Sequence, residues 1–552
     1  MGEGESSHCS GRGAGRISHS MERPASGTYP LRTDPLPFSR RSMVVFLFAM
    51  AWLSAIAWWH RYVVMDDPWI TFRYAQNLLA GNGWAFNPGE PLEGYSNFLW
   101  VLLSLVPLGL GVEPLGFARF AGWLSAVGAV GLLAFGLGRR EAVLYIPRSR
   151  RAAILLAGCY PLAVWSVGGL ETAFHTLLVM LYGFALAGLM DRPEARRGAV
   201  AGVLLLALGL SRPEGAMFAA LLVLVPLWRR TAEGWRGTAV AVAVFGAGYL
   251  VYTLWRLQTF GTIVPNTVSA KVGGGPVGRA LEGLGYAYDY FRGPPSVLLL
   301  LGLLAGWRWR KAVVEGSRVP PGRAPGLVPA MGAIVLLQGA FAVAVGGDWM
   351  PGSRFLVPLL PALCVVAAVG LRRWLPPLQA LVIFFLLAGG LLQARQDPEL
   401  RWCRWAAKEA GGELLVQPLA EAGDWLRRHS FGEGLLAGSE AGMLPYRSGL
   451  EFVDMLGLVD AHLAALPGGL HEKFDAEYVL SREPDFIALT WVDEVDGPWP
   501  AWEADGEMAG NERFQTEYGE LVRFPRLLPS AHWDMRSAHL VLYGRGERVR
   551  AE

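Results

Sequence analysis

Charged residues are scarce in this sequence, and so are cysteines. Only 17% of the 552 residues are charged, whereas 53% are hydrophobic. The net charge of +2, without any basic patch interleaved with aromatic residues, excludes nucleic acid as an expected partner. Cys9, Cys159, Cys364 and Cys403 are far apart and form no CxxC pair, so we expect packing residues rather than a disulfide framework or a zinc site. The mean hydropathy of +0.31 predicts many membrane spans with a soluble part attached.

The beginning of the chain lacks a long hydrophobic run. Residues 1–38 are rich in Gly, Ser, Arg and Pro and have no apolar periodicity, which predicts a disordered tail. A secretory signal is not expected, because such a signal has its apolar core nearer the start, followed by a small-residue cleavage site. Met21 and Met43 could be alternative start residues.

Apolar runs are what the rest of the sequence has in abundance. A membrane-spanning helix needs about 20 predominantly apolar residues. We expect eleven spans, of which two short ones flank the polar turn "SRPEG". The runs lie at 43–60, 117–137, 152–168, 171–190, 199–210, 215–228, 238–256, 295–308, 326–345, 355–371 and 375–391.

Arginine-rich loops predict the orientation of these spans. If the apolar run 96–111 lies along the membrane interface or re-enters, every basic loop, such as 138–151, falls on the cytoplasmic side, as the positive-inside rule requires. The N-terminal tail is then cytoplasmic, and residues 39–394 form a transmembrane domain with a long first outer loop, 61–116. Hydropathy falls after this domain, and short apolar runs alternate with helical stretches. Residues 395–552 are therefore expected to form a soluble α/β domain on the outer face.

Ionisable residues gather in the outer loops at the predicted membrane boundaries. Such residues usually line a polar cavity on a functional pathway, although any one of them could merely snorkel or cap a helix. Carboxylates suit a base or a metal, and Arg and Lys suit a phosphate. A cavity with both, opening beside lipid, fits a lipid-linked phosphate substrate, although a proton-coupled transporter could share this inventory. These residues are Glu171, Arg212, Glu214, Lys271, Asp348 and Arg354.

The first outer loop opens with the paired aspartates of "MDDPW". Asp67 followed by Pro68 is typical of a helix N-terminus, and the helix that follows is expected to be short, amphipathic and lying on the membrane. Asp66 has no comparable local duty. Further along the loop, Glu93 and Asn97 belong to a polar cluster just before the interfacial run.

The segment "DDPWITFRYAQNLLAGNGWAFNPGEPLEGYSNFLW" resembles the first outer loop of the GT-C membrane glycosyltransferases. More narrowly, it is similar to the terminal β-(1→2)-arabinofuranosyltransferases of actinobacterial cell-wall assembly, whose relatives are often named flagellar motor control proteins. The similarity continues in "GLETA", "RPEG", "PNTVSAKV", "GGDWMPGSRFLVPLLP" and "DMLGLVD". This sequence has Pro-Trp after the aspartates where the family has Ala-Phe, and "EPLEGYSN" where the family has "ERVEGYTN".

The resemblance implies a mainly helical GT-C fold in the bacterial inner membrane, with a periplasmic C-terminal domain. It implies transfer of a sugar, such as arabinofuranose, from a polyprenyl phosphate to a cell-envelope glycan or lipid acceptor. The catalytic carboxylate would be Asp66 or Asp67, with Asp66 the first choice for the base that deprotonates the acceptor hydroxyl. The donor phosphate would be bound by Lys271, Arg354 and Arg212. The sugar or acceptor would be bound by Arg73, Glu93, Asn97, Glu171, Asn266 and Asp348.

Several alternatives stay open at this point. Asp66 and Asp67 could instead hold a divalent cation through carboxylate oxygens. Asp454 and Asp460 could close over the cavity or be ordinary strand-end and loop acids. A lipid-linked glycan transporter or flippase is an alternative function, although we find no clear internal repeat of the kind that transporters often have. A non-catalytic scaffold of the envelope or of motility is another.

Overall fold

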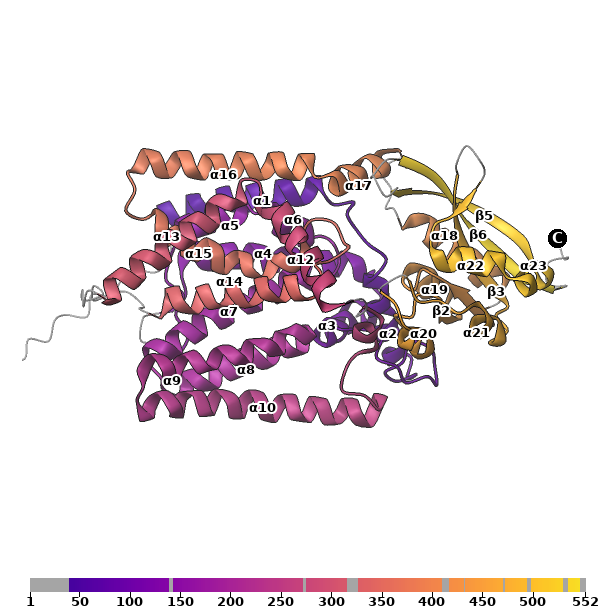
Figure 1. Ribbon diagram of the computed structural model, residues 1–552, viewed down its shortest axis with the longest axis horizontal. Coiled ribbons are helices and arrows are strands. Elements are labelled where there is room, and N and C mark those ends of the chain that lie inside the picture. Colours follow the sequence, from indigo (N-terminus) through magenta and orange to yellow (C-terminus); the bar gives the residue numbers. More distant parts are fainter. Residues whose placement is uncertain are drawn as a thin grey trace, which may run out of the picture.

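The computed structural model describes residues 39–138, 142–271, 275–314, 326–409, 416–430, 432–469, 472–493, 498–529 and 535–546. These residues form a long bundle of helices with a smaller sheet domain at one end (Figure 1). The fold is mainly helical, as predicted. The predicted tail at 1–38, including Cys9, lies outside the described residues.

All eleven predicted apolar runs are helical. Seven helices among the described residues are long and apolar enough to cross a membrane. They are α1 (Arg40–Trp59), α4 (Pro114–Phe135), α7 (Thr172–Asp191), α10 (Ala232–Phe260), α14 (Leu327–Ala344), the continuous η2 (Arg354–Leu359) and α15 (Leu360–Leu371), and α16 (Pro376–Gln396). The chain is therefore an integral membrane protein.

Four further runs are shorter, broken or more highly charged. They are α5 (Arg150–Ala157) with α6 (Tyr160–Trp165), α8 (Ala195–Ser211), η1 (Pro213–Val223) with α9 (Leu224–Arg229), and α13 (Pro295–Val314). They run alongside the seven long helices in Figure 1. A total of eleven spans stays a prediction.

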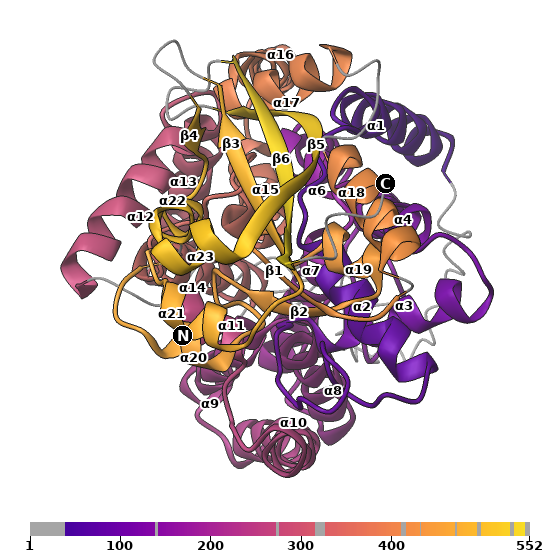
Figure 2. The same cartoon turned by 90° about the vertical axis from the view of Figure 1, so that its right-hand side faces the viewer.

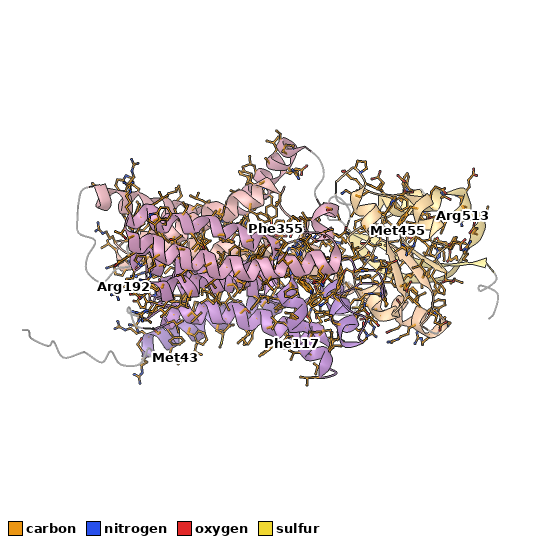
Figure 3. All side chains as sticks on the ribbon, turned by 90° about the horizontal axis from the view of Figure 1, so that it is seen from below. Met43, Phe117, Arg192, Phe355, Met455 and Arg513 are labelled. Carbon is orange, nitrogen blue, oxygen red and sulfur yellow. The ribbon has the colours of Figure 1, made fainter. Side chains whose placement is uncertain are left out.

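The two ends of the bundle differ in what they carry. Met43, in α1, and Arg192, which follows α7, lie at the end far from the sheet domain (Figure 3). Met455 and Arg513 lie in the sheet domain at the opposite end. Phe355, at the start of η2, lies toward the sheet domain. The orientation of these ends across a membrane stays a prediction.

The first outer loop contains α2 (Pro68–Leu79) and α3 (Phe98–Gly109). The expectation that α2 lies on the membrane surface is wrong, because Pro68–Ala75 are all buried by protein. The helix packs against α3 on one side and against α19 (Met443–Ser448) of the sheet domain on another. The twelve residues of α3 are roughly 18 Å long, too short for a hydrocarbon core of about 30 Å.

The sheet domain has six strands in the order β2-β1-β3-β6-β5, with β4 paired to β3. Strands β1 (Leu435–Gly438), β2 (Glu451–Asp454) and β3 (Phe486–Val492) are parallel to one another. Strands β4 (Trp499–Pro500), β5 (Tyr518–Pro529) and β6 (Met535–Arg545) complete the sheet with antiparallel pairs. This is a mixed α/β domain, and Figure 2 shows it in front of the end of the bundle. In α/β sheets, ligands bind beyond the carboxyl ends of parallel strands, and the loops after β1 and β2 contact the bundle here.

Shorter helices connect and cover these parts. In the bundle they are α11 (Asn266–Lys271) and α12 (Pro276–Phe291), and α17 (Pro398–Glu409) leads from α16 toward the sheet. In the sheet domain they are α18 (Gln417–His429), α20 (Ala461–Ala465), α21 (Ala476–Ser481), α22 (Glu503–Gly510) and α23 (Glu512–Glu517).

The cysteines of the described residues are buried and form no disulfide. The Sγ atoms of Cys159 and Cys364 lie 3.7 Å apart between the start of α6 and α15. Both belong to the apolar core of the bundle. The prediction that they are packing residues is confirmed.

Candidate active site

Asp66 holds the bundle and the sheet domain together. Its two carboxylate oxygens accept hydrogen bonds from the backbone N–H of Gly442, at 2.6 Å, and of Met443, at 2.7 Å. Glycine is required at position 442, because a Cβ atom there would lie 2.0 Å from the backbone oxygen of Asp66. Burial, followed by the charge of Glu440, raises the pKa of Asp66 to about 8, although the two N–H donors lower it. Asp66 therefore joins the bundle to the sheet domain, a structural role that its local sequence did not predict.

Asp67 has the opposite surroundings. Helix α2 begins at Pro68 with Asp67 as its N-cap residue, as predicted, but the carboxylate makes no capping hydrogen bond. The backbone of Asp67 is already helical (φ −54°, ψ −35°), whereas capping side chains normally require an extended backbone. No hydrogen bond or ion pair engages this half-buried carboxylate within the described part of the chain. We predicted that Asp67 caps the helix and that Asp66 is free. The contacts are the reverse: Asp66 accepts two hydrogen bonds, and Asp67 makes no capping hydrogen bond.

Lys271 is a cation within electrostatic range of Asp67. It ends α11 and interacts electrostatically with Asp67, Asp348, Arg354 and Arg212. Four of the predicted site residues, from three separate loops, therefore lie within electrostatic range of this one ammonium group. Considering the described residues only, Lys271 forms no ion pair, so its charge is available to a ligand.

Arg354 is paired within its own loop. Its Nε atom lies 2.5 Å from Oδ2 of Asp348, and the two side chains are only 6% and 4% exposed. The guanidinium carbon lies 5.3 Å from the ring centroids of both Trp165 and Phe355. Ser353 allows the loop to turn back because it adopts the left-handed conformation, with φ +53°.

Arg212 is paired on two sides. Its Nη1 atom lies 2.6 Å from Oε1 of Glu171, and its Nε atom donates to Glu214. Asn97 donates to the other oxygen of Glu171 at 2.8 Å and exchanges hydrogen bonds with Thr71 of α2. The motifs "GLETA", "RPEG" and "YSN" therefore meet in one buried cluster. Because two carboxylates neutralise Arg212, it is less available to a phosphate than Lys271.

Glu93 has a partner that the sequence reading missed. Arg256, in the last turns of α10, places Nη2 2.6 Å from Oε2 of Glu93, and Tyr252 donates to Oε1 at 3.3 Å. Burial raises the pKa of Glu93 to about 7, although Arg256 opposes that rise. The signal available in the sequence was an arginine at the end of an apolar run, since charges inside spanning helices usually have a function.

Two residues that were predicted to bind the sugar or acceptor, Arg73 and Asn266, make hydrogen bonds between the bundle and the sheet domain. The guanidinium of Arg73 donates to the carbonyl oxygens of Pro445, at 2.5 Å, and Leu450, at 2.6 Å. The amide of Asn266 donates to the carbonyl oxygen of Gly457 at 2.9 Å. Since these polar groups are already used, the structure gives both residues an interdomain role.

Asp454 and Asp460 are strand-end and loop acids, the second of the two alternatives. The carboxylate of Asp454 accepts backbone hydrogen bonds from Leu456, at 3.0 Å, and Val459, at 2.9 Å. Asp460 caps α20 by accepting the N–H of Leu463 at 3.0 Å. Both carboxylates therefore accept hydrogen bonds from backbone groups of the sheet domain itself.

A divalent cation does not fit between the two aspartates. Across the residues that the structure describes, no group of three or more Asp, Glu, His or Cys side chains could hold a metal ion. Both oxygens of Asp66 already accept backbone hydrogen bonds.

The fold is GT-C-like, as predicted. The chain resembles the crystal structure of ArnT from Cupriavidus metallidurans bound to undecaprenyl phosphate, with a TM-score of 0.54 and 14% sequence identity. The similarity covers 92% of this chain and 99% of that chain. The same enzyme in its apo state gives a TM-score of 0.54 with 13% identity.

Two curated relatives give a more specific likeness. Both are named terminal β-(1→2)-arabinofuranosyltransferase; one, from Mycobacterium tuberculosis, is 31% identical over 373 residues, and the other, from Corynebacterium glutamicum, is 30% identical over 373 residues. The matches cover 61% and 60% of this chain but only 57% and 52% of the relatives. A family model described as "Domain of unknown function (DUF8728)" matches residues 407–541, which include the sheet. The resemblance predicted from the first outer loop is confirmed.

Proposed function

We propose that this chain is a membrane glycosyltransferase that moves a sugar from a polyprenyl phosphate to a cell-envelope glycan or lipid acceptor. The observation that carries the proposal is the free carboxylate of Asp67 within electrostatic range of Lys271, a cation that forms no ion pair among the described residues. A base and a phosphate-binding cation are the two groups that this transfer needs. The reaction would take place on the side of the sheet domain, which we assign to the periplasmic face of a bacterial inner membrane. The names of the relatives support arabinofuranose as the first sugar to test.

The proposed reaction is a direct transfer. Asp67 takes the proton of the acceptor hydroxyl while the hydroxyl oxygen forms a bond to the anomeric carbon of the donor sugar. The bond between that carbon and the phosphate oxygen breaks, and polyprenyl phosphate leaves with the additional negative charge. Lys271 stabilises this charge as it develops.

Asp67 is preferred to Asp66 as the base because a base needs a free oxygen within hydrogen-bond reach of the acceptor hydroxyl. Both oxygens of Asp66 are occupied by Gly442 and Met443. Lys271 is preferred for the phosphate, with Arg354 and Arg212 contributing to the local field. In the same arrangement, Glu171, Asn97, Asp348 and Glu93 would line the pocket for the sugar or acceptor.

The test uses the full chain in proteoliposomes with radiolabelled polyprenyl-phosphoryl arabinofuranose and an arabinan oligosaccharide acceptor. We expect transfer by the wild type and a loss of at least about 100-fold in kcat for Asp67→Asn, with an unchanged unfolding temperature. Glu90→Gln is the control, because Glu90 is an exposed acid of the same loop.

Other polyprenyl-phosphoryl sugars are then offered in the same assay. The absence of transfer from every donor would overturn the enzyme class. Full activity of Asp67→Asn, together with a loss in Asp66→Asn that leaves the fold intact, would restore Asp66 as the base.

A further inference from the structure

The loop after β1 has a contact at almost every position. Ser439 donates to Oδ1 of Asp505 at 2.6 Å, and Oε1 of Glu440 lies 2.7 Å from Nη1 of Arg526. Gly442 then donates its N–H to Asp66. The loop "SEAG" (residues 439–442) is therefore anchored to α22 and β5 at its start and reaches the aspartate pair at its end.

The ion pair inside this loop is buried. The side chains of Arg526 and Glu440 are 7% and 12% exposed. Arg526 also donates to Oγ1 of Thr490 at 3.1 Å, and its Nε atom is buried with no hydrogen-bond partner in the described ranges. Burying two charges costs desolvation energy that their attraction often fails to recover. Stability alone is therefore a weak explanation for Glu440, and a role in the neighbouring site is a better one.

The backbone connects this loop to Asp67. The carbonyl oxygen of Asp66 accepts the N–H of Trp69 at 3.2 Å, and that of Asp67 accepts the N–H of Ile70 at 3.1 Å. The carboxylate of Asp66 is fixed by the loop, and its carbonyl packs directly against Gly442. A shift of the loop would therefore move the backbone at Asp66 and turn the side chain of Asp67.

We propose that Glu440 is a positioning residue of the transfer reaction: held by Arg526, it fixes the loop 439–442 and thereby aims the carboxylate of Asp67. This inference rests on the proposed function and deepens it, because it makes the sheet domain part of the catalytic unit. The electrostatics agree with the geometry. The charged groups that act on Asp66 are Glu440 and Asp67, while Arg526 faces Glu440 and Lys271 faces Asp67.

The test compares Glu440→Gln with Glu90→Gln in the reconstituted full chain. Glu90 is a matched control because it also pairs with an arginine, Arg482, at 2.7 Å, but on the exposed rim between the domains. With polyprenyl-phosphoryl arabinofuranose, we expect Glu440→Gln to lower kcat by about 10- to 100-fold, since a misplacement of about 1 Å can cost that much. KM for the donor should stay within about twofold, because Lys271 is untouched. Glu90→Gln should keep the wild-type kcat.

A second readout does not depend on activity. Hydrogen exchange at the amides of Gly442 and Met443 reports whether the loop still contacts Asp66. We expect faster exchange in Glu440→Gln and wild-type exchange in Glu90→Gln. Wild-type kcat, or unchanged exchange, in Glu440→Gln would overturn the positioning role. An inactive wild type with every donor would overturn the proposed function and the catalytic role of the loop, whereas the exchange result would still show whether Glu440 holds it.

Discussion

Asp66 and Asp67 are adjacent in the sequence, but their carboxylates differ in hydrogen bonding. Asp66 receives two backbone hydrogen bonds from a segment that is distant in sequence, and Asp67 receives none among the described residues. Nothing local distinguishes them in this way, since the dipeptide Asp67-Pro68 is typical of a helix N-terminus. The sequence could therefore indicate the pair as a candidate site but could not predict which carboxylate is free of hydrogen bonds.

The close approach of Gly442 to Asp66 yields a prediction at the residue scale. In Gly442→Ala, the new methyl group would meet a backbone oxygen at 2.0 Å, and backbone atoms cannot move aside cheaply. We expect a loss of roughly 1–3 kcal/mol in the free energy of unfolding, and a lower kcat. Thermal unfolding followed by tryptophan fluorescence measures the first effect, and the radiolabel assay measures the second.

Gly510→Ala is the control for this variant. Gly510 ends α22 in the same domain, and a Cβ atom there meets nothing within 4 Å. It should stay within about 0.5 kcal/mol of the wild type. Equal stabilities of the Gly442 and Gly510 variants would contradict the contact.

At the scale of elements, helix α2 is the piece that joins the two domains. Its position could not be predicted from its own pattern. When only the helix is considered, a charged residue such as Arg73 predicts a face exposed to solvent. In the structure, Arg73 instead donates to carbonyl groups of α19 and of the loop that follows it. The apolar runs were easier to predict, because a spanning helix is defined by local composition alone.

Removing the guanidinium of Arg73 tests this contact between the two domains. Arg73→Met keeps the apolar stem but leaves the carbonyl oxygens of Pro445 and Leu450 without this donor. We expect the free energy of unfolding to fall by about 2 kcal/mol or more, and faster hydrogen exchange in α19. Arg427→Met is the control, because Arg427 is 58% exposed in its pair with Asp424. Protection of α19 that matches the control would argue against this contact.

For the whole molecule, stability should depend on pH through the buried acids of the sheet domain. Burial raises the pKa of Asp505 to about 7, above its ordinary value, and does the same for Asp454. The folded state then holds a proton that the unfolded state has already released. The stabilisation that this bound proton gives is therefore fully present below the pKa of the unfolded state. It is lost as pH rises through the pKa of the folded state.

We expect the unfolding temperature of the wild type to fall between about pH 5 and pH 7.5, with each acid contributing at most about 1.4 kcal/mol per pH unit. Asp505→Asn should reduce this slope, whatever its effect on absolute stability, and Glu507→Gln, an exposed neighbour on α22, is the control. Thermal unfolding in detergent across the pH range measures it. An unchanged slope in Asp505→Asn would show that this carboxyl does not bind the proton.

The burial of Arg73 against the sheet domain also affects the order of events during synthesis. The carbonyl of Pro445 lies 372 residues further along the sequence than the guanidinium that it binds. At about 5–20 residues per second, the ribosome needs roughly 20–75 s to make that stretch. During synthesis, the loop of Asp66 and Asp67 is therefore made well before the sheet domain that it contacts. A nascent chain arrested before residue 442 would carry Asp67, the base that we propose, in a loop whose partners in the sheet domain have not yet been made.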